Sequence, residues 1–253
     1  LFVNYSQGFR VPTVSEIAPF SGAIATGLNP EQSDSYEIGT RLRYQDIAQF
    51  KTSWFLIDVE DEITFDSTTR TAIAPFGQNV NIGKTRRYGI ETRLDLNPIE
   101  EIDLYGSYTW TRAYVAETNP SGSLADGREL GQVPENRFTF GTYVRPLTRF
   151  GEVYEDFKIG LNGVFTSRQH PSGYESNSQA LLNATGGAGH VIKSFKVWNF
   201  ITTYAWREKE IYFKINNLFD EKYYNRAVNA TSFGTAIYPA GNFTFVNPGP
   251  PRE

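Results

Sequence analysis

Four carboxylates crowd into five consecutive positions of the chain: Asp58, Glu60, Asp61 and Glu62. Carboxylate oxygens are the ligands that Ca²⁺ and Mg²⁺ prefer, so this cluster could bind a divalent cation. The segment around it alternates like a β-strand, however, and alternating side chains divide between two faces. Because the four cannot all converge, we expect no metal site and interpret the cluster as a solvated strand tip.

The histidines and serines of one polar, Gly-rich stretch are the next candidates for chemistry. His170 and His190 are the two histidines, and the chain contains no Cys, so thiolate sites and disulfides are excluded. Ser176 and Ser178 lie near His170 in the sequence, but nothing orients them as the nucleophile of a Ser/His/Asp constellation. Nucleophile-elbow and phosphate-loop patterns are absent. We therefore expect no metal, no cofactor and no enzyme activity.

Composition narrows the class of protein that must position these residues. The 253 residues carry a net charge of −4, which argues against a nucleic-acid-binding protein with a basic face. Aromatic residues make up 15% of the chain, yet its mean hydropathy is only −0.41. No apolar run of about 18 residues exists, which excludes a transmembrane helix. A β-barrel can still cross a membrane, because only every second residue then faces lipid.

Alternating apolar and polar residues predict nine strands. The alternation is sharpest where Tyr36, Ile38 and Leu42 occupy one face while Arg41 and Arg43 occupy the other. The nine predicted strands cover residues 1–9, 33–44, 49–65, 81–96, 102–115, 137–145, 157–165, 197–206 and 211–216. An Asn97-Pro98 pair predicts a tight turn, and residues 225–253 are expected to form a last polar loop.

Strand length and loop length favour a membrane barrel over a soluble sandwich. Strands of about ten residues suit a tilted bilayer crossing, and long loops at one end with tight turns at the other are typical of outer-membrane barrels. We predict an all-β, antiparallel transmembrane barrel with one apolar face toward lipid and one charged face toward a wet interior. The residues that define these faces are Phe138, Phe140, Trp198 and Phe200 for lipid, and Arg41 and Arg93 for the interior. A soluble β-rich binding module would instead cover the Tyr88, Ile90 and Leu94 face with protein.

A family resemblance begins at residues 216–224, NNLFDEKYY. This string resembles the motif on the penultimate barrel strand of TonB-dependent outer-membrane receptors, and GFRVPT at 8–13 is similar to a string that closes an upward strand there. We expect the motif to be structural, a strand exit at which Asn and Asp side chains bend the chain. Its residues are Asn216, Asn217, Leu218, Phe219, Asp220, Tyr223 and Tyr224.

The resemblance implies a partial barrel. Receptors of that family have 22 strands and a plug in the lumen, and nine strands cannot close a bacterial single-chain barrel, which has an even number. Residues 1–253 are then expected to be the C-terminal portion of such a barrel, an internal piece that lacks the final strand. The plug domain and the energy-coupling segment would lie outside this sequence.

The resemblance also implies a function. The protein would be an active transport receptor of the bacterial outer membrane, embedded in lipid and lipopolysaccharide, that imports a scarce nutrient, most often a ferric siderophore. Energy would come from the TonB–ExbB–ExbD complex, acting through the missing N-terminal region. The alternatives are a passive porin-type channel and an outer-membrane barrel enzyme. An iron chelate would be cargo rather than a cofactor.

Cargo-binding residues follow from the chemistry of such chelates. Anionic chelates call for Arg donors, and planar chelates call for aromatic faces. The loop and upper-wall residues with these properties are Arg10, Arg70, Arg128, Arg168, His170, Tyr174 and Tyr238.

Overall fold

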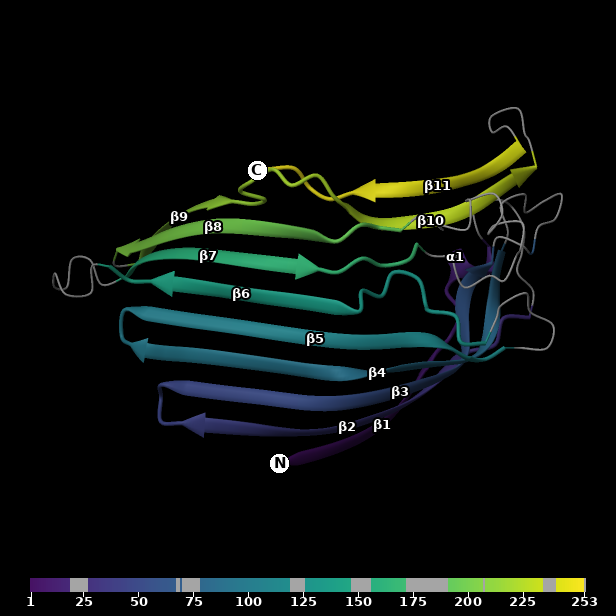
Figure 1. Ribbon diagram of the computed structural model, residues 1–253, viewed down its shortest axis with the longest axis horizontal. Helices are drawn as coiled ribbons and strands as arrows, with labels where there is room; N and C mark the ends of the chain where they lie inside the picture. Colours follow the sequence, from purple (N-terminus) through teal and green to yellow (C-terminus); the bar gives the residue numbers. More distant parts are fainter. Residues whose placement is uncertain are drawn as a thin grey trace.

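The computed structural model is a single curved sheet with a smaller hairpin beside one end (Figure 1). Nine antiparallel strands follow one another in chain order, so that each strand pairs with its neighbours in the sequence. We call this sheet the wall. The structure describes residues 1–18, 27–66, 69, 78–118, 126–146, 156–171, 191–206, 208–233 and 240–252.

The nine strands that alternation predicts are confirmed, with longer boundaries for several. They are β1 (Phe2–Arg10), β2 (Glu31–Tyr44), β3 (Ala48–Asp66), β4 (Gln78–Ile99), β5 (Ile102–Glu117), β6 (Asn136–Val144), β7 (Asp156–Thr166), β8 (Phe195–Trp206) and β9 (Lys209–Ile215). The predicted turn at Asn97-Pro98 is wrong. β4 continues through both residues to Ile99, and the ladder to β5 absorbs them as a register shift between Leu96 and Ile99.

The expectation of a polar loop over residues 225–253 is also wrong. β10 (Tyr224–Phe233) and β11 (Ala240–Pro248) pair as an antiparallel hairpin, with a bulge between Tyr224 and Arg226. In Figure 1 this hairpin continues the line of β9 toward the side on which α1 (Val14–Ile17) lies. α1 is a single turn, and within the described residues no helix is long and apolar enough to cross a membrane.

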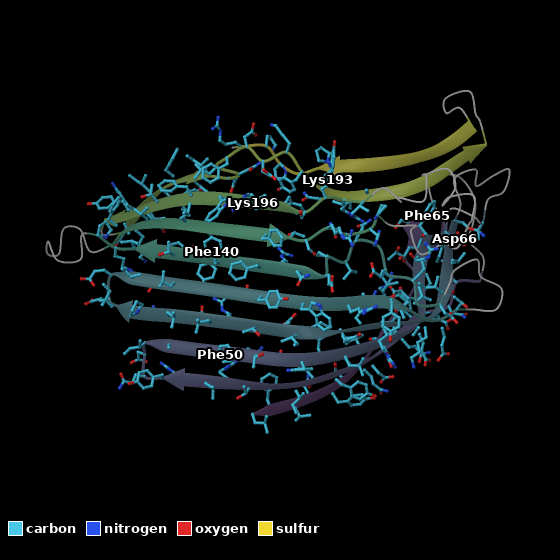
Figure 2. The ribbon with its side chains drawn as sticks, in the orientation of Figure 1. Phe50, Phe65, Asp66, Phe140, Lys193 and Lys196 are labelled. Atoms are coloured by element: carbon cyan, nitrogen blue, oxygen red, sulfur yellow. The ribbon has the colours of Figure 1, made fainter. Side chains whose placement is uncertain are left out.

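Connections of different length leave the two ends of the wall. The short links between β2 and β3, β4 and β5, and β8 and β9 lie at one end, together with a longer connection between Val144 of β6 and Asp156 of β7. The long connections after β1, β3, β5 and β7 leave from the other, which we call the loop end. Figure 2 shows Phe50 and Phe140 along the wall, whereas Phe65 and Asp66 lie at the far end of β3, on the loop-end side.

The wall has two unlike faces. The register aligns Leu42, Phe50 and Leu94 across β2, β3 and β4, and Phe140 contacts Trp198 edge-to-face at 4.8 Å between ring centroids. This is the outer face. Arg41, Lys51 and Arg93 align in the adjacent row and point to the opposite, inner face.

The apolar outer face is not packed into a protein core. Trp54 is 62% exposed, Leu42 60% and Phe138 42%. The extensive contacts of each strand are with its neighbours in the sheet, and in the described part of the chain no second sheet packs over this face. A row of large exposed apolar side chains of this extent needs a non-aqueous neighbour. The arrangement therefore disfavours the soluble sandwich and supports a lipid-facing surface.

Candidate functional site

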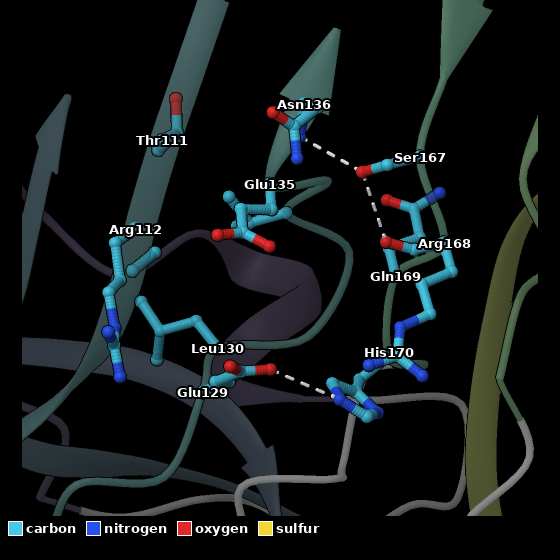
Figure 3. A pocket seen from close by; sticks show the side chains of 12 residues that line it. Thr111, Arg112, Glu129, Leu130, Glu135, Asn136, Ser167, Arg168, Gln169 and His170 are labelled. Carbon is cyan, nitrogen blue, oxygen red and sulfur yellow. Dashed lines mark hydrogen bonds and ion pairs between the residues drawn. The ribbon is translucent and has the colours of Figure 1, made fainter. Parts of the chain in front are cut away.

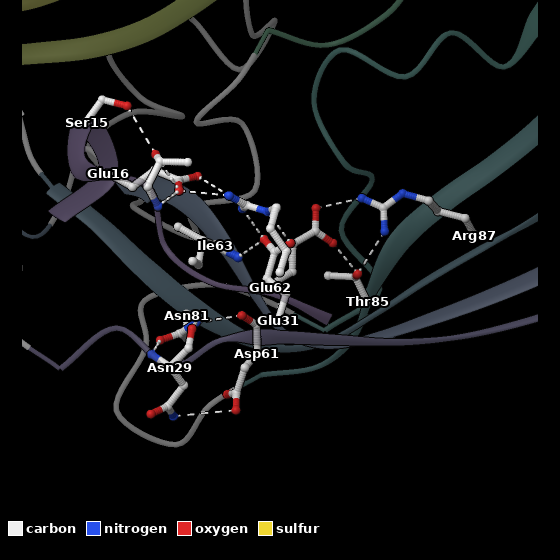
Figure 4. A network of polar contacts seen from close by, with 12 residues as sticks. Ser15, Glu16, Asn29, Glu31, Asp61, Glu62, Ile63, Asn81, Thr85 and Arg87 are labelled. Carbon is white, nitrogen blue, oxygen red and sulfur yellow. Dashed lines mark hydrogen bonds and ion pairs between the residues drawn. The ribbon is translucent and has the colours of Figure 1, made fainter. Parts of the chain in front are cut away.

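Arg10 connects β1, β2 and α1 on the inner face at the loop end. Its guanidinium donates two hydrogen bonds to Glu31 on β2, at 2.6 and 2.7 Å, and two to Glu16 in α1, at 2.8 and 2.9 Å (Figure 4). Glu16 also accepts from the backbone N–H of Thr13, and Glu31 accepts from that of Ile63. The Arg10 guanidinium lowers the pKa of Glu16 to about 2. Two carboxylates thus neutralise Arg10 and tie α1 to the wall.

A change of face at Asp61 brings Glu62 to the same side. Asp61 has a φ of +55°, which is uncommon for a residue with a side chain. Strict alternation would send Glu62 to the outer face. Instead Glu62 accepts a hydrogen bond from Arg87 at 2.6 Å and another from the Thr85 hydroxyl, and both donors lie on the inner face. The inner surface here is a network of paired charges.

The outer face at this level carries ion pairs of its own. Asp58 accepts two hydrogen bonds from Arg86, at 2.6 and 2.7 Å, and lies 3.5 Å from the Lys84 ammonium. The acidic cluster is therefore not simply a solvated strand tip, because Asp58 and Glu62 are shielded by arginines on opposite faces. No group of three or more potential metal ligands occurs among the described residues. We interpret the ion pairs as the boundary at which the outer face leaves hydrocarbon.

A pocket of about 340 Å³ lies at the loop end of the wall, where β6 begins and β7 ends (Figure 3). His170 contacts Glu129 at 3.1 Å, and Arg112, Glu135 and Arg168 are the other charged residues of the lining. Burial lowers the pKa of His170, and the nearby Arg168 and Arg128 act in the same direction while Glu129 opposes them. At neutral pH this histidine is held uncharged.

The structure brings together three of the predicted cargo-binding residues, Arg128, Arg168 and His170, in this region. Arg10 lies apart from them on β1, engaged with its two carboxylates. Arg70, Tyr174 and Tyr238 lie outside the described residues, as do Ser176, Ser178 and His190. Sequence reasoning missed Glu129 and Arg112, because a single charge in a strand or loop carries no spacing signal.

The 216–224 motif forms a bend that joins three parts of the chain. Asn217 is 2% exposed, with a φ of +49°. Its side chain accepts a hydrogen bond from the Glu221 N–H at 2.8 Å and donates to the carbonyls of Glu221 and Pro250 at 3.0 and 3.1 Å. Its own N–H donates to the Asn199 side chain on β8 at 2.9 Å. This geometry supports a structural role for the motif.

Aromatic packing completes the bend. The Tyr223 ring stacks on Phe195 at 4.4 Å between centroids, and the Gly249 N–H donates to the Tyr223 carbonyl. Tyr223 lies between β9 and β10, and its burial raises the pKa of its phenol. Asp220, with a φ of +53°, is bound by the Lys222 ammonium, which lowers the pKa of that carboxyl.

Comparison with known sequences identifies one family. A family model described as TonB dependent receptor-like, beta-barrel, matches residues 1–218. The iron-regulated outer membrane virulence protein of Vibrio cholerae serotype O1 is 30% identical over 150 residues, which are 53% of this chain and 22% of that protein. The matched part therefore spans about a fifth of the length of that relative.

Solved structures share the fold over nearly the whole chain. The copper transporter OprC superposes with a TM-score of 0.67 at 18% identity, covering 99% of this chain and 35% of its own. The ferric-catecholate import receptor Fiu from Escherichia coli K12 superposes with a TM-score of 0.62 at 19% identity, covering 99% and 31%. Likeness at these identities concerns the arrangement of strands alone.

Proposed function

The chain belongs to the TonB-dependent receptors, whose β-barrels lie in the bacterial outer membrane, and on that premise we propose that it is part of a nutrient importer. The family consists of transport receptors rather than enzymes. We assign residues 1–253 to the C-terminal portion of the barrel, with the plug domain elsewhere in the protein. The observation that supports this most directly is the two-sided wall, because its charged inner face suits a water-filled or plug-filled lumen.

We propose a ferric siderophore as the cargo. One relative is named for its regulation by iron, and one structural neighbour is a ferric-catecholate import receptor. The presence of a copper transporter among the neighbours means that the strand arrangement by itself does not choose the metal. Capture would take place at the loop end, where Arg128, Arg168 and His170 gather, with Arg10, Arg70, Tyr174 and Tyr238 as further predicted contacts.

The energy for import would come from the TonB–ExbB–ExbD complex acting on the plug. The test is uptake of a labelled ferric chelate by cells that make the complete receptor, with and without a functional coupling complex. We expect accumulation only when coupling is intact, and saturation at low chelate concentration. Uptake that is indifferent to coupling would contradict active transport and favour a passive porin-type channel.

A further inference from the structure

A second pocket, of about 480 Å³, opens on the inner face where β7, β8 and β9 reach the loop end. Arg137 and Asn199 line it, and they alternate in sequence with Phe138 and Trp198 on the outer face. The pocket therefore faces the barrel interior rather than lipid. None of its lining residues is among the predicted cargo-binding residues.

Gln132 fixes one side of this pocket to the β10–β11 hairpin. Its φ is +60°, and its N–H donates to the His170 carbonyl at 2.7 Å. Its carboxamide donates to the Ala227 carbonyl at 3.1 Å and accepts from Arg226 at 3.0 Å. A non-glycine residue is held in this conformation only where surrounding contacts determine it. The pocket wall is thus built from segments far apart in the sequence and tied by directional bonds.

The charge of the lining distinguishes this pocket from its neighbours. It contains one cationic side chain, Arg137, and no Asp or Glu. The pocket beside His170 contains Glu129 and Glu135, and two others at the β1–β2 edge contain Glu31 with Glu62, and Asp34 with Glu60. Arg137 is exposed, and within the described part of the chain it forms no ion pair.

The remaining lining is rich in neutral hydrogen-bonding groups. The carboxamides of Gln169, Asn216 and Asn225 line the cavity, and the stacked rings of Phe195 and Tyr223 supply an apolar side. Carboxamides donate to anionic oxygens without carrying charge, and a lone guanidinium adds a charge-assisted hydrogen bond. Such a lining favours an organic anion over a neutral or cationic molecule of equal size.

We propose that this pocket binds the anionic part of the cargo, with Arg137 as the residue that selects negatively charged chelates. The inference rests on the proposed function, because it assumes that an iron chelate enters the barrel interior. Arg137 donates to an anionic oxygen of the chelate, the carboxamides bind its carbonyl or hydroxyl groups, and the ring pair contacts its organic framework.

The test uses the complete receptor in detergent and two probes, a ferric tricatecholate, which is negatively charged, and a ferric trihydroxamate, which is neutral. We expect Arg137→Gln to weaken binding of the tricatecholate roughly ten- to a hundredfold, the worth of a hydrogen bond to a charged group, and to leave trihydroxamate binding unchanged. Arg137→Lys should retain part of the affinity. Arg41→Gln is the matched control, since Arg41 is exposed on the same inner face but lies outside the pocket.

Each outcome decides one question. If the unmutated receptor binds the tricatecholate and Arg137→Gln binds it equally well, the pocket assignment is overturned while the proposed function stands. If both probes are lost equally, or Arg41→Gln has the same effect as Arg137→Gln, charge selection by Arg137 is overturned. If the unmutated receptor binds neither chelate, the iron-chelate cargo is wrong and the pocket assignment is overturned with it.

Discussion

Asn217 shows at the residue scale why the bend after β9 takes an asparagine. Asparagine tolerates the left-handed backbone conformation better than other residues that bear a side chain, apart from aspartate. It can also donate and accept at once, and here the amide satisfies the N–H of Glu221 and the carbonyls of Glu221 and Pro250. An aspartate would have the right shape but two acceptors and no donor.

Asn217→Asp should therefore destabilise the receptor by about 2 kcal/mol, because the carbonyls of Glu221 and Pro250 lose their donor and face a carboxylate on a side chain that is itself buried. Denaturant unfolding of the complete receptor in detergent micelles measures this free energy, and hydrogen exchange locates the loss at the bend. Asn216→Asp is the control, as no side-chain hydrogen bond is described for Asn216. Equal effects of the two substitutions would show that the bonds of Asn217 are not what holds the bend.

The limits of sequence reasoning are visible at the same scale. Alternation assigned Arg41 and Arg93 to the inner face without any knowledge of the partner strands. Alternation placed Glu62 on the wrong face. The left-handed backbone conformation of Asp61 changes the face to which the next side chain points, and the alternation pattern gives no sign of that conformation. Gln132 likewise gave no signal, since its partners Ala227 and Arg226 lie far away in the sequence.

Among the elements, the β4–β5 pairing depends on close approach at Gly89. A Cβ built on Gly89 would lie 2.0 Å from the carbonyl oxygen of Trp110 and 2.8 Å from the Phe55 ring. The backbone atom cannot move without disturbing the ladder, so any side chain must push the two strands apart. Gly106 on β5 differs, because its nearest neighbour would be 4.0 Å away.

We expect Gly89→Ala to destabilise the barrel by about 1–3 kcal/mol, as overpacking does elsewhere, and Gly106→Ala to leave its stability nearly unchanged or slightly improved. Thermal and denaturant unfolding of the folded receptor in micelles would compare the two. A Gly106→Ala variant as unstable as Gly89→Ala would mean that glycine is needed for strand flexibility rather than for space.

The β10–β11 hairpin is the element that the sequence did not reveal, for a physical reason. Strands in the bilayer alternate because lipid and lumen differ, and that contrast is what periodicity detects. The segment NRAVNATSF of β10 mixes polar and apolar residues without a period of two. β10 and β11 pair with each other and not with the nine-stranded wall, and without that alternation the composition of the segment favours a loop although the backbone pairs regularly.

Across the whole molecule, apolar side chains lie mainly on the outer face of the wall and charged side chains lie mainly on its inner face, and the lipid-facing interpretation depends on this partition. The outer face carries the exposed side chains of Leu94 and Trp54, which we assign to acyl chains, while the inner face carries Arg41 and Glu91, which we assign to the barrel interior. Family membership, outer-membrane location and the proposed import all agree with that partition. It was predictable from alternation and strand length, whereas the cargo is a matter of local chemistry at the loop end.

The most direct test of this partition is cysteine accessibility in native outer membranes. The 253 residues contain no cysteine, so within this part of the receptor each introduced cysteine is the one reactive thiol. Single cysteines would replace Ile90, Glu91, Arg93 and Leu94 on β4 of the complete receptor. The account predicts that Glu91→Cys and Arg93→Cys react with a charged, water-soluble thiol reagent, and that Ile90→Cys and Leu94→Cys react only with a lipid-soluble one. Reaction of all four with the charged reagent at similar rates would contradict it.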